Sequence, residues 1–160
     1  MLYFTIYDSP LGKILLLSDG IALTGLDFEG HWPNCQRIPG ALPVFGEGKI
    51  WLDAYFRGEE PEITFPIAPA GTAFQEMVWE ILLTIPKGHT RSYGDIAREM
   101  AQRLGKEKMS AHAVGQAVGR NPISIIIPCH RVVGAKGQLT GYASGLEKKI
   151  WLLNHEGVIL

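Results

Sequence analysis

A stretch rich in proline and glycine divides the chain into two parts with different hydrophobic patterns. Residues 58–71 contain three prolines and two glycines, which favours an extended linker. Apolar residues before this stretch alternate with polar residues, as they do in β-strands, whereas most apolar residues after it recur at helical spacing. We therefore predict two domains, residues 1–70 and residues 71–160, with the boundary near Pro69-Ala70-Gly71.

The first domain is predicted to belong to the α/β (α+β) class, with a small antiparallel sheet and one helix. Three alternating runs separated by turn residues favour an antiparallel meander, and they cover residues 2–7, 13–18 and 21–28. Residues 29–43 are rich in Gly, Pro and Asn, and we expect them to form a loop. Residues 45–56 are predicted to form a helix whose buried face carries Ile50, Trp51, Ala54 and Tyr55.

The second domain is predicted to be mostly helical, with a winged-helix-like helix-turn-helix. Capping boxes at Thr72-Ala73-Phe74-Gln75 and Ser92-Tyr93-Gly94-Asp95 indicate the starts of two helices. Ser110 is expected to cap a third helix over residues 111–118, and the turn before it completes the helix-turn-helix outline. A last helix over residues 146–155 is predicted to bury Ile150, Trp151, and Leu153 or Leu152.

The net charge of −1 conceals a difference between the two domains. Residues 1–70 carry four basic and nine acidic residues, a net charge of −5, and residues 71–160 carry eleven basic and seven acidic residues, a net charge of +4. This asymmetry is compatible with chance, and equally with a second domain that alone binds a polyanion.

The chain has no apolar run near the roughly 20 residues that span a bilayer, and no cationic leader opens it. We therefore expect a cytoplasmic protein without a membrane partner. The two cysteines, Cys35 and Cys129, are far apart in dissimilar settings, so reduced thiols are expected. Cys35 lies near His31, but no further ligands occur at useful spacing, and no metal site is predicted.

Cys129 follows an apolar run that ends in Pro128 and precedes His130 and Arg131. Pro128 fixes its own φ angle, so the thiol is presented in a defined direction. The neighbouring imidazole and guanidinium groups are expected to favour the thiolate, which is the nucleophilic form. Adjacent side chains of an extended chain point to opposite faces, so contact between Cys129 and His130 requires a turn or a bridging water. The residues predict a reactive cysteine, with a buried packing cysteine as the alternative.

The helix predicted at residues 111–118 consists mainly of small residues and includes Gly115. Glycine inside a helix costs roughly 1 kcal/mol relative to alanine, so a neighbour is expected to approach this helix closely. Tight helix–helix packing explains this, and so does a helix that lies against a nucleic-acid groove.

Taken together, these segments resemble the O6-alkylguanine-DNA alkyltransferases, also called methylated-DNA–protein-cysteine methyltransferases. Pro128-Cys129-His130-Arg131-Val132 matches the active-site signature of that family. The resemblance covers about residues 72–157, and its other segments are Ala113-Val114-Gly115, Asn121-Pro122-Ile123, Gly141-Tyr142 and residues 151–157. Residues 1–70 resemble the N-terminal domain of the family by length and pattern only.

The resemblance implies DNA repair by one stoichiometric transfer of an alkyl group from O6-alkylguanine, in duplex DNA, to Cys129. O4-alkylthymine is a further candidate substrate, and the damaged base would be flipped out of the duplex. His130 would remove the thiol proton through a water, Glu156 would hold His130, and Asn121 would orient this network. The implied protein is a monomer that needs no cofactor and has damaged double-stranded DNA as its partner.

Base recognition is also implied by the resemblance. Tyr93 would donate a hydrogen bond to guanine as negative charge leaves O6. The backbone carbonyls of Cys129 and Val132 would bind the exocyclic amine. Backbone N–H groups near Ala143, which follows Tyr142, would address O6. Some members of the family have a serine where this chain has Ala143, and a backbone donor survives that change.

The small-residue helix would lie in the minor groove, with Ala111, His112 and Gly115 as candidate contacts. Many members have an arginine where this chain has His112, so support for the flipped base is expected to differ. Candidate contacts chosen for their charge are Arg120, Arg98, Lys106, Lys108 and, from the signature, Arg131.

Other interpretations remain open from the residues alone. Tyr93 fits the apolar edge of a helix, Glu156 and His155 fit exposed helix-end charges, and Asn121 fits a helix terminator. A cysteine hydrolase and a non-catalytic helix-turn-helix protein that binds lesions are the alternative functions.

Overall fold

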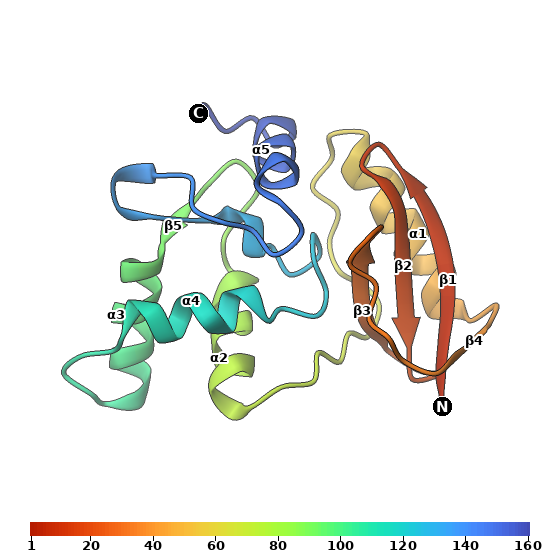
Figure 1. Ribbon diagram of the computed structural model, residues 1–160, viewed down its shortest axis with the longest axis horizontal. Helices are drawn as coiled ribbons and strands as arrows, with labels where there is room; N and C mark the ends of the chain where they lie inside the picture. Colours follow the sequence, from red (N-terminus) through yellow and green to blue (C-terminus); the bar gives the residue numbers. More distant parts are fainter. The chain divides into compact units, whose positions relative to one another are not determined.

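The computed structural model describes all 160 residues, which form two compact units (Figure 1). The first unit consists of Met1–Ala70 together with Pro122–Ser124, and the second of Gly71–Asn121 and Ile125–Leu160. The inclusion of Pro122–Ser124 in the first unit was not anticipated, because the sequence pattern indicates only one division along the chain.

The first unit contains a four-stranded sheet with the order β3-β2-β1-β4. The strands β1 (Leu2–Ser9), β2 (Gly12–Ser18) and β3 (Leu23–Phe28) form the antiparallel meander that the alternation predicts. Strand β3 begins later than predicted because Ile21 belongs to the preceding turn, where its N–H bonds Asp19 Oδ1 at 2.9 Å.

A short edge strand, β4 (Arg37–Pro39), lies parallel to β1 inside the segment predicted to be a loop. A segment of three residues that includes a proline is too short to show the alternation typical of a strand. This segment is a strand because it pairs with β1. The Arg37 guanidinium lies over the Phe4 ring of β1, 5.5 Å from its centroid, and adds a cation–π contact.

Helix α1 (Pro43–Phe56) contacts β1, β2 and β3 in the first unit (Figure 1). It begins two residues before the predicted start because Pro43 fits the first helical turn. Trp51, Leu52 and Tyr55 are buried, whereas Ile50 is 69% exposed. The assignment of Ile50 to the buried face was therefore wrong, and Leu52 takes that place.

Two extended segments are joined to β3 by backbone hydrogen bonds. Leu23 N–H bonds Pro66 O at 2.9 Å and Ala68 N–H bonds Leu23 O at 2.8 Å, so the predicted linker is extended here. Leu26 N–H bonds Pro122 O at 2.9 Å, and Ser124 N–H bonds Leu26 O at 3.2 Å.

The second unit is mostly helical, as predicted. Its helices are α2 (Ala73–Leu82), α3 (Tyr93–Leu104), α4 (Ala111–Gly119) and α5 (Leu146–His155). Both predicted capping boxes are present, and the Ser110 hydroxyl accepts the Ala113 N–H at 3.1 Å. A two-stranded parallel sheet, β5 (Arg91–Ser92) and β6 (Val132–Val133), was not predicted because each strand has only two residues.

Trp79 connects α2 to α4 in the core of this unit. Its indole Nε1–H bonds Ala117 O at 2.9 Å, and both residues are buried. A Cβ atom on Gly71 would lie 2.5 Å from the Trp79 ring, so only glycine fits where the chain enters the unit. No helix of the chain is long and apolar enough to cross a bilayer.

Helix α5 has a different buried face from the one predicted. Lys149, Leu152 and Leu153 are buried, whereas Ile150 and Trp151 are only partly buried. The prediction considered only apolar side chains, and it therefore placed Ile150 and Trp151 on the buried face of the helix. A lysine was not considered as a core residue, because lysine is almost never fully buried.

Candidate active site

Cys129 opens a single 3₁₀ turn, η1 (Cys129–Arg131), rather than an extended segment. Its N–H bonds Ile127 O at 2.8 Å, and Arg131 N–H bonds Pro128 O at 3.0 Å. Just before this turn, Ile125 has a φ of 70°, a left-handed conformation that costs a β-branched residue about 1–3 kcal/mol. The sequence leading to Cys129 is therefore held in a tight, strained path.

The Cys129 thiol is buried, with 6% of the residue exposed. Its Sγ lies 3.8 Å from the Tyr142 hydroxyl, toward which the thiol donates. Asn121 Nδ2 donates to Ile127 O at 2.8 Å and so fixes the path of the chain next to the thiol. Burial raises the pKa of Cys129, and the interactions with Asn121, Tyr142 and Lys149 offset that rise only in part. The prediction that the imidazole and guanidinium groups near the thiol favour the thiolate left out this burial, which outweighs the groups that lower the pKa of Cys129.

His130, Glu156 and Arg131 form one buried network at the other side of the turn. His130 Nε2 lies 2.6 Å from Glu156 Oε2. The Arg131 guanidinium donates from Nε to Glu156 Oε1 at 2.8 Å and from Nη2 to Oε2 at 3.1 Å. Its Nη1 donates to Ile85 O at 2.5 Å. Both carboxylate oxygens of Glu156 are therefore occupied.

This network corrects the prediction that Arg131 contacts DNA. Its side chain is 11% exposed, and its guanidinium is used by Glu156 and Ile85. No local sequence pattern indicates this, because Glu156 lies 25 residues and Ile85 lies 46 residues away. Glu156 itself is buried, so it is not the exposed helix-end carboxylate that was considered as an alternative.

The protonation states in this network follow from burial and hydrogen bonding. Burial lowers the pKa of His130 and outweighs the opposing effect of Glu156, so the imidazole is neutral at pH 7. Burial alone would raise the pKa of Glu156, but the hydrogen bonds from His130 and Arg131 and the Arg131 charge hold it far below its usual range. An ionised Glu156 requires the proton of His130 on Nε2. Nδ1, which is buried and bonds no protein group, is then the basic nitrogen.

Tyr93 stands at the start of α3, where its hydroxyl accepts a hydrogen bond from Thr140 Oγ1 at 3.2 Å. A hollow of about 420 Å³ opens beside this pair. It is lined by Tyr93, Ala111, His112, Gly115, Gln116, Thr140 and Gly141. The same hollow is therefore bordered by Tyr93, which is predicted to bind the base, and by three predicted DNA contacts of the small-residue helix.

The remaining predicted base contacts lie on the segment after Cys129. Val132 is buried in β6, and its N–H bonds the Cys129 carbonyl, which keeps one lone pair for another donor. Tyr142 is partly buried next to the thiol, and Ala143 is exposed.

Helix α4 exposes Ala111, His112 and Gly119, and Arg120 follows on the surface. A Cβ atom at Gly115 would make only ordinary contacts with the Tyr93 ring, at 3.6 and 3.7 Å, and a Cβ at Gly119 would meet nothing within 4 Å. Packing inside the protein therefore does not require glycine at these two positions.

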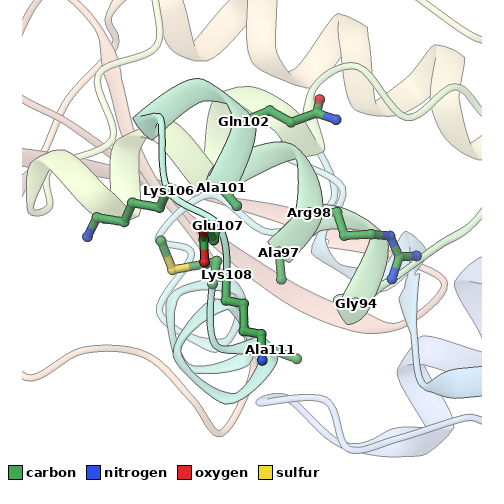
Figure 2. A pocket seen from close by; sticks show the side chains of 10 residues that line it. Gly94, Ala97, Arg98, Ala101, Gln102, Lys106, Glu107, Lys108 and Ala111 are labelled. Atoms are coloured by element: carbon green, nitrogen blue, oxygen red, sulfur yellow. The ribbon is translucent and has the colours of Figure 1, made fainter.

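The other cationic candidates surround a second hollow, of about 390 Å³, beside α3 and the turn to α4 (Figure 2). Arg98 extends from α3, and Lys106 and Lys108 extend from the turn (Figure 2). Arg98 also forms an ion pair with Asp95, and Glu107 lines the same hollow, so the positive charge there is partly balanced.

Two residues of the site were missed by sequence reasoning. Thr140 bonds Tyr93, and Lys149 Nζ donates to the Thr140 carbonyl at 3.4 Å. Lys149, Leu152, Leu153 and Glu156 are spaced as one face of a helix, and this spacing was the available signal for Lys149. Cys35, the other cysteine, lies in the first unit. Its sulfur is 3.7 Å from Arg37 Nη1.

Comparison with known proteins gives matches along almost the whole chain. Residues 2–69 match the ribonuclease-like domain of 6-O-methylguanine DNA methyltransferase, and residues 73–158 match its DNA binding domain. The methylated-DNA–protein-cysteine methyltransferase of Mycobacterium leprae is 45% identical over 159 residues, which are 98% of this chain and 93% of that protein. The protein of that name from Haemophilus influenzae is 45% identical over 161 residues, with 98% and 87% covered.

Solved structures give the same result. The O6-methylguanine methyltransferase of Mycobacterium tuberculosis is 43% identical, with a TM-score of 0.84 and coverage of 98% of this chain and 93% of that chain. The Mycobacterium tuberculosis OGT in complex with DNA is 43% identical, with a TM-score of 0.85 and coverage of 96% and 92%. These likenesses confirm the predicted fold class.

Proposed function

Because the chain belongs to the 6-O-methylguanine DNA methyltransferase family, we propose that Cys129 is the residue that accepts the alkyl group from O6-alkylguanine in duplex DNA. The protein repairs DNA by direct transfer of an alkyl group to a protein cysteine. One observation carries the assignment to Cys129: it is buried and directly precedes a buried histidine whose Nε2 lies 2.6 Å from a carboxylate oxygen of Glu156. Cys35 has an arginine near its sulfur and no such pair.

The proposed reaction breaks the bond between guanine O6 and the alkyl carbon and forms a bond between that carbon and Sγ. The thiol proton passes to Nδ1 of His130 through a water, because Glu156 keeps the other ring nitrogen protonated. The electron pair of the broken bond stays on guanine, which takes up one proton and becomes an ordinary base. The thioether is stable, so each protein molecule reacts once.

Tyr93 and the hollow beside it are proposed to receive the flipped base. The Tyr93 hydroxyl already accepts from Thr140, so its own O–H is free to donate a hydrogen bond to guanine as negative charge develops on the base. The carbonyls of Cys129 and Val132 would accept the exocyclic amine, and the backbone beside Tyr142 and Ala143 would donate to O6.

Helix α4 is proposed to lie in the minor groove, with Ala111, His112 and Gly115 toward the DNA and Arg120 at a phosphate. The tolerance for a Cβ at Gly115 and Gly119 supports an external partner as the reason for the small residues. Residues 71–160 would thus carry DNA binding and transfer, residues 1–70 would act as a scaffold, and a monomer would suffice.

The test is the intact mass of the protein after it is mixed at an equimolar ratio with a duplex that contains one O6-methylguanine. We expect one added methyl group, mapped to the Cys129 peptide, and restored guanine in the DNA. Cys129→Ser should bind the duplex without gaining mass, and Cys35→Ser should react as the unaltered protein does. Transfer by Cys129→Ser would refute the assignment, repeated turnover would favour a hydrolase, and binding without an adduct would indicate a lesion-binding protein.

A further inference from the structure

Thr140 is the side chain that bonds the tyrosine proposed to bind the base. Its hydroxyl donates to the Tyr93 hydroxyl at 3.2 Å, across 47 positions of the chain, and neither hydroxyl has another hydrogen-bond partner in the protein. Both residues line the same hollow of about 420 Å³. The proposed mechanism gives Tyr93 a task and leaves the role of Thr140 open.

The backbone and the methyl group of Thr140 are held in place as well as its hydroxyl. Its carbonyl accepts from Lys149 Nζ at 3.4 Å, which anchors the backbone to α5. Its γ-methyl lies against Gly134, where an added Cβ would come within 3.0 Å of it. A β-branched side chain has few χ1 rotamers, and a methyl group seated against the backbone selects one of them. The hydroxyl is therefore aimed at Tyr93 and cannot turn to another acceptor without displacing the methyl group.

This hydrogen bond fixes the direction in which Tyr93 can donate. A phenolic hydroxyl has one proton, and its oxygen can accept from one neighbour while it donates to another. The Thr140 hydroxyl occupies an acceptor position of the Tyr93 oxygen. The Tyr93 proton is then left for a group that enters the hollow. A hydrogen bond accepted by a hydroxyl also polarises its own O–H, which makes the tyrosine a stronger donor.

We propose that Thr140 is a positioning residue for the transfer: its hydroxyl turns the Tyr93 O–H into the hollow and strengthens the hydrogen bond that Tyr93 donates to the flipped base. This proposal rests on the proposed role of Tyr93. The effect is greatest in the transition state, because the base gains negative charge as the bond between O6 and the alkyl carbon breaks. Since Thr140 acts through Tyr93, its effect must vanish when the tyrosine hydroxyl is removed.

The test is a cycle of four proteins: the unaltered chain, Thr140→Val, Tyr93→Phe and the double variant. Valine keeps the branched shape of threonine and replaces its hydroxyl by a methyl group. One measured quantity is the single-turnover rate of methyl transfer from a saturating O6-methylguanine duplex. The other is the preference for that duplex over undamaged duplex, taken as a ratio of Kd values in a Cys129→Ser background. Thr84→Val is the matched control, because the Thr84 hydroxyl bonds Ile81 O at 2.6 Å, at the end of α2.

We expect Thr140→Val to slow transfer by about 3- to 10-fold, which is the effect of one hydrogen bond. It should also reduce the preference for the lesion duplex and leave the affinity for undamaged duplex unchanged. Thr140→Ser, which keeps the hydroxyl, should retain most of the rate and the preference. In the Tyr93→Phe background, Thr140→Val should have no further effect, and Thr84→Val should match the unaltered protein. If Thr140→Val does not fold, Thr140→Ala takes its place in both assays.

An unchanged or faster rate in Thr140→Val would overturn the proposal, and a faster rate would mean that Tyr93 donates to Thr140 instead. An equal loss in the Tyr93→Phe background would also overturn it, since Thr140 would then act independently of the tyrosine. Failure of the proposed function itself is distinguishable, because the unaltered protein would then gain no methyl group from the duplex. The lesion preference of Thr140→Val, compared with that of Thr140→Ser, would still decide whether the Thr140 hydroxyl positions Tyr93.

Discussion

Replacing Glu156 by glutamine perturbs the centre of the buried network while keeping the shape of the side chain. Glu156 accepts from His130 with one oxygen and from Arg131 with both. A glutamine has one acceptor oxygen and one donor group, so one of its neighbours loses its acceptor. If the amide NH₂ faces His130, Nε2 must become the acceptor, and the ring proton moves to Nδ1.

The size of the effect follows from these contacts. With its proton on Nδ1, His130 no longer has a basic nitrogen available for the thiol proton, and loss of general-base catalysis slows a reaction by about 10²–10⁴-fold. The Arg131 guanidinium would remain buried without a counter-charge, which costs about 3–5 kcal/mol when a buried ion pair is broken. We therefore expect slower transfer and lower stability in the same variant.

Single-turnover methyl transfer, measured by quenching samples for mass analysis, gives the rate, and urea denaturation gives the free energy of unfolding. Glu147→Gln is the control, because Glu147 is an exposed carboxylate on the same helix. It should leave both quantities nearly unchanged. An unaltered rate in Glu156→Gln would remove Glu156 from the reaction, and an unaltered stability would show that the buried ion pair contributes little.

Two further predictions concern other parts of the chain. His112→Arg, made in a Cys129→Ser background, should bind the lesion duplex more tightly, because a longer and permanently charged side chain supports the flipped base better than a histidine does; an unchanged affinity in a binding titration would contradict this. Burial raises the pKa of Asp27, on β3, from 3.8 to about 6, so the folded protein binds its proton more tightly than the unfolded chain. Asp27→Asn should therefore be more stable above pH 6, by about 1–2 kcal/mol after allowance for partial exposure, and this advantage should vanish as the pH falls toward 4. Urea denaturation at several pH values checks this, and an advantage independent of pH would refute it.

The sequence predicted well what local chemistry determines. The capping boxes at Thr72 and Ser92 were found because each depends on a residue three positions away. The family and its activity were predicted from the segment around Cys129, and the comparisons confirm both. The roles of His130, Glu156 and Tyr93 remain predictions, although the structure brings the first two together at 2.6 Å.

What the sequence could not provide depends on partners that are distant along the chain. Arg131 was predicted to contact DNA, and its buried partners were not anticipated because Glu156 and Ile85 are not near it in the sequence. The neighbours of the thiol were expected to favour the thiolate because they are visible in the sequence, whereas burial, which raises the pKa of Cys129, is not. Strand β4 was missed because its pairing with β1, rather than its own residues, makes it a strand.

Helix α5 shows why these long-range contacts must be considered together. Lys149 and Glu156 lie two turns apart on one buried face, separated by Leu152 and Leu153. Glu156 stands at the C-terminal end of the helix, where the helix dipole disfavours a carboxylate by about 0.3–1 kcal/mol. Its charge-assisted bonds to Arg131, at about 1.5–3 kcal/mol each, outweigh that cost. Because one rigid helix carries both charges, a shift of its register by one residue would rotate each of them by about 100° and remove both from the site.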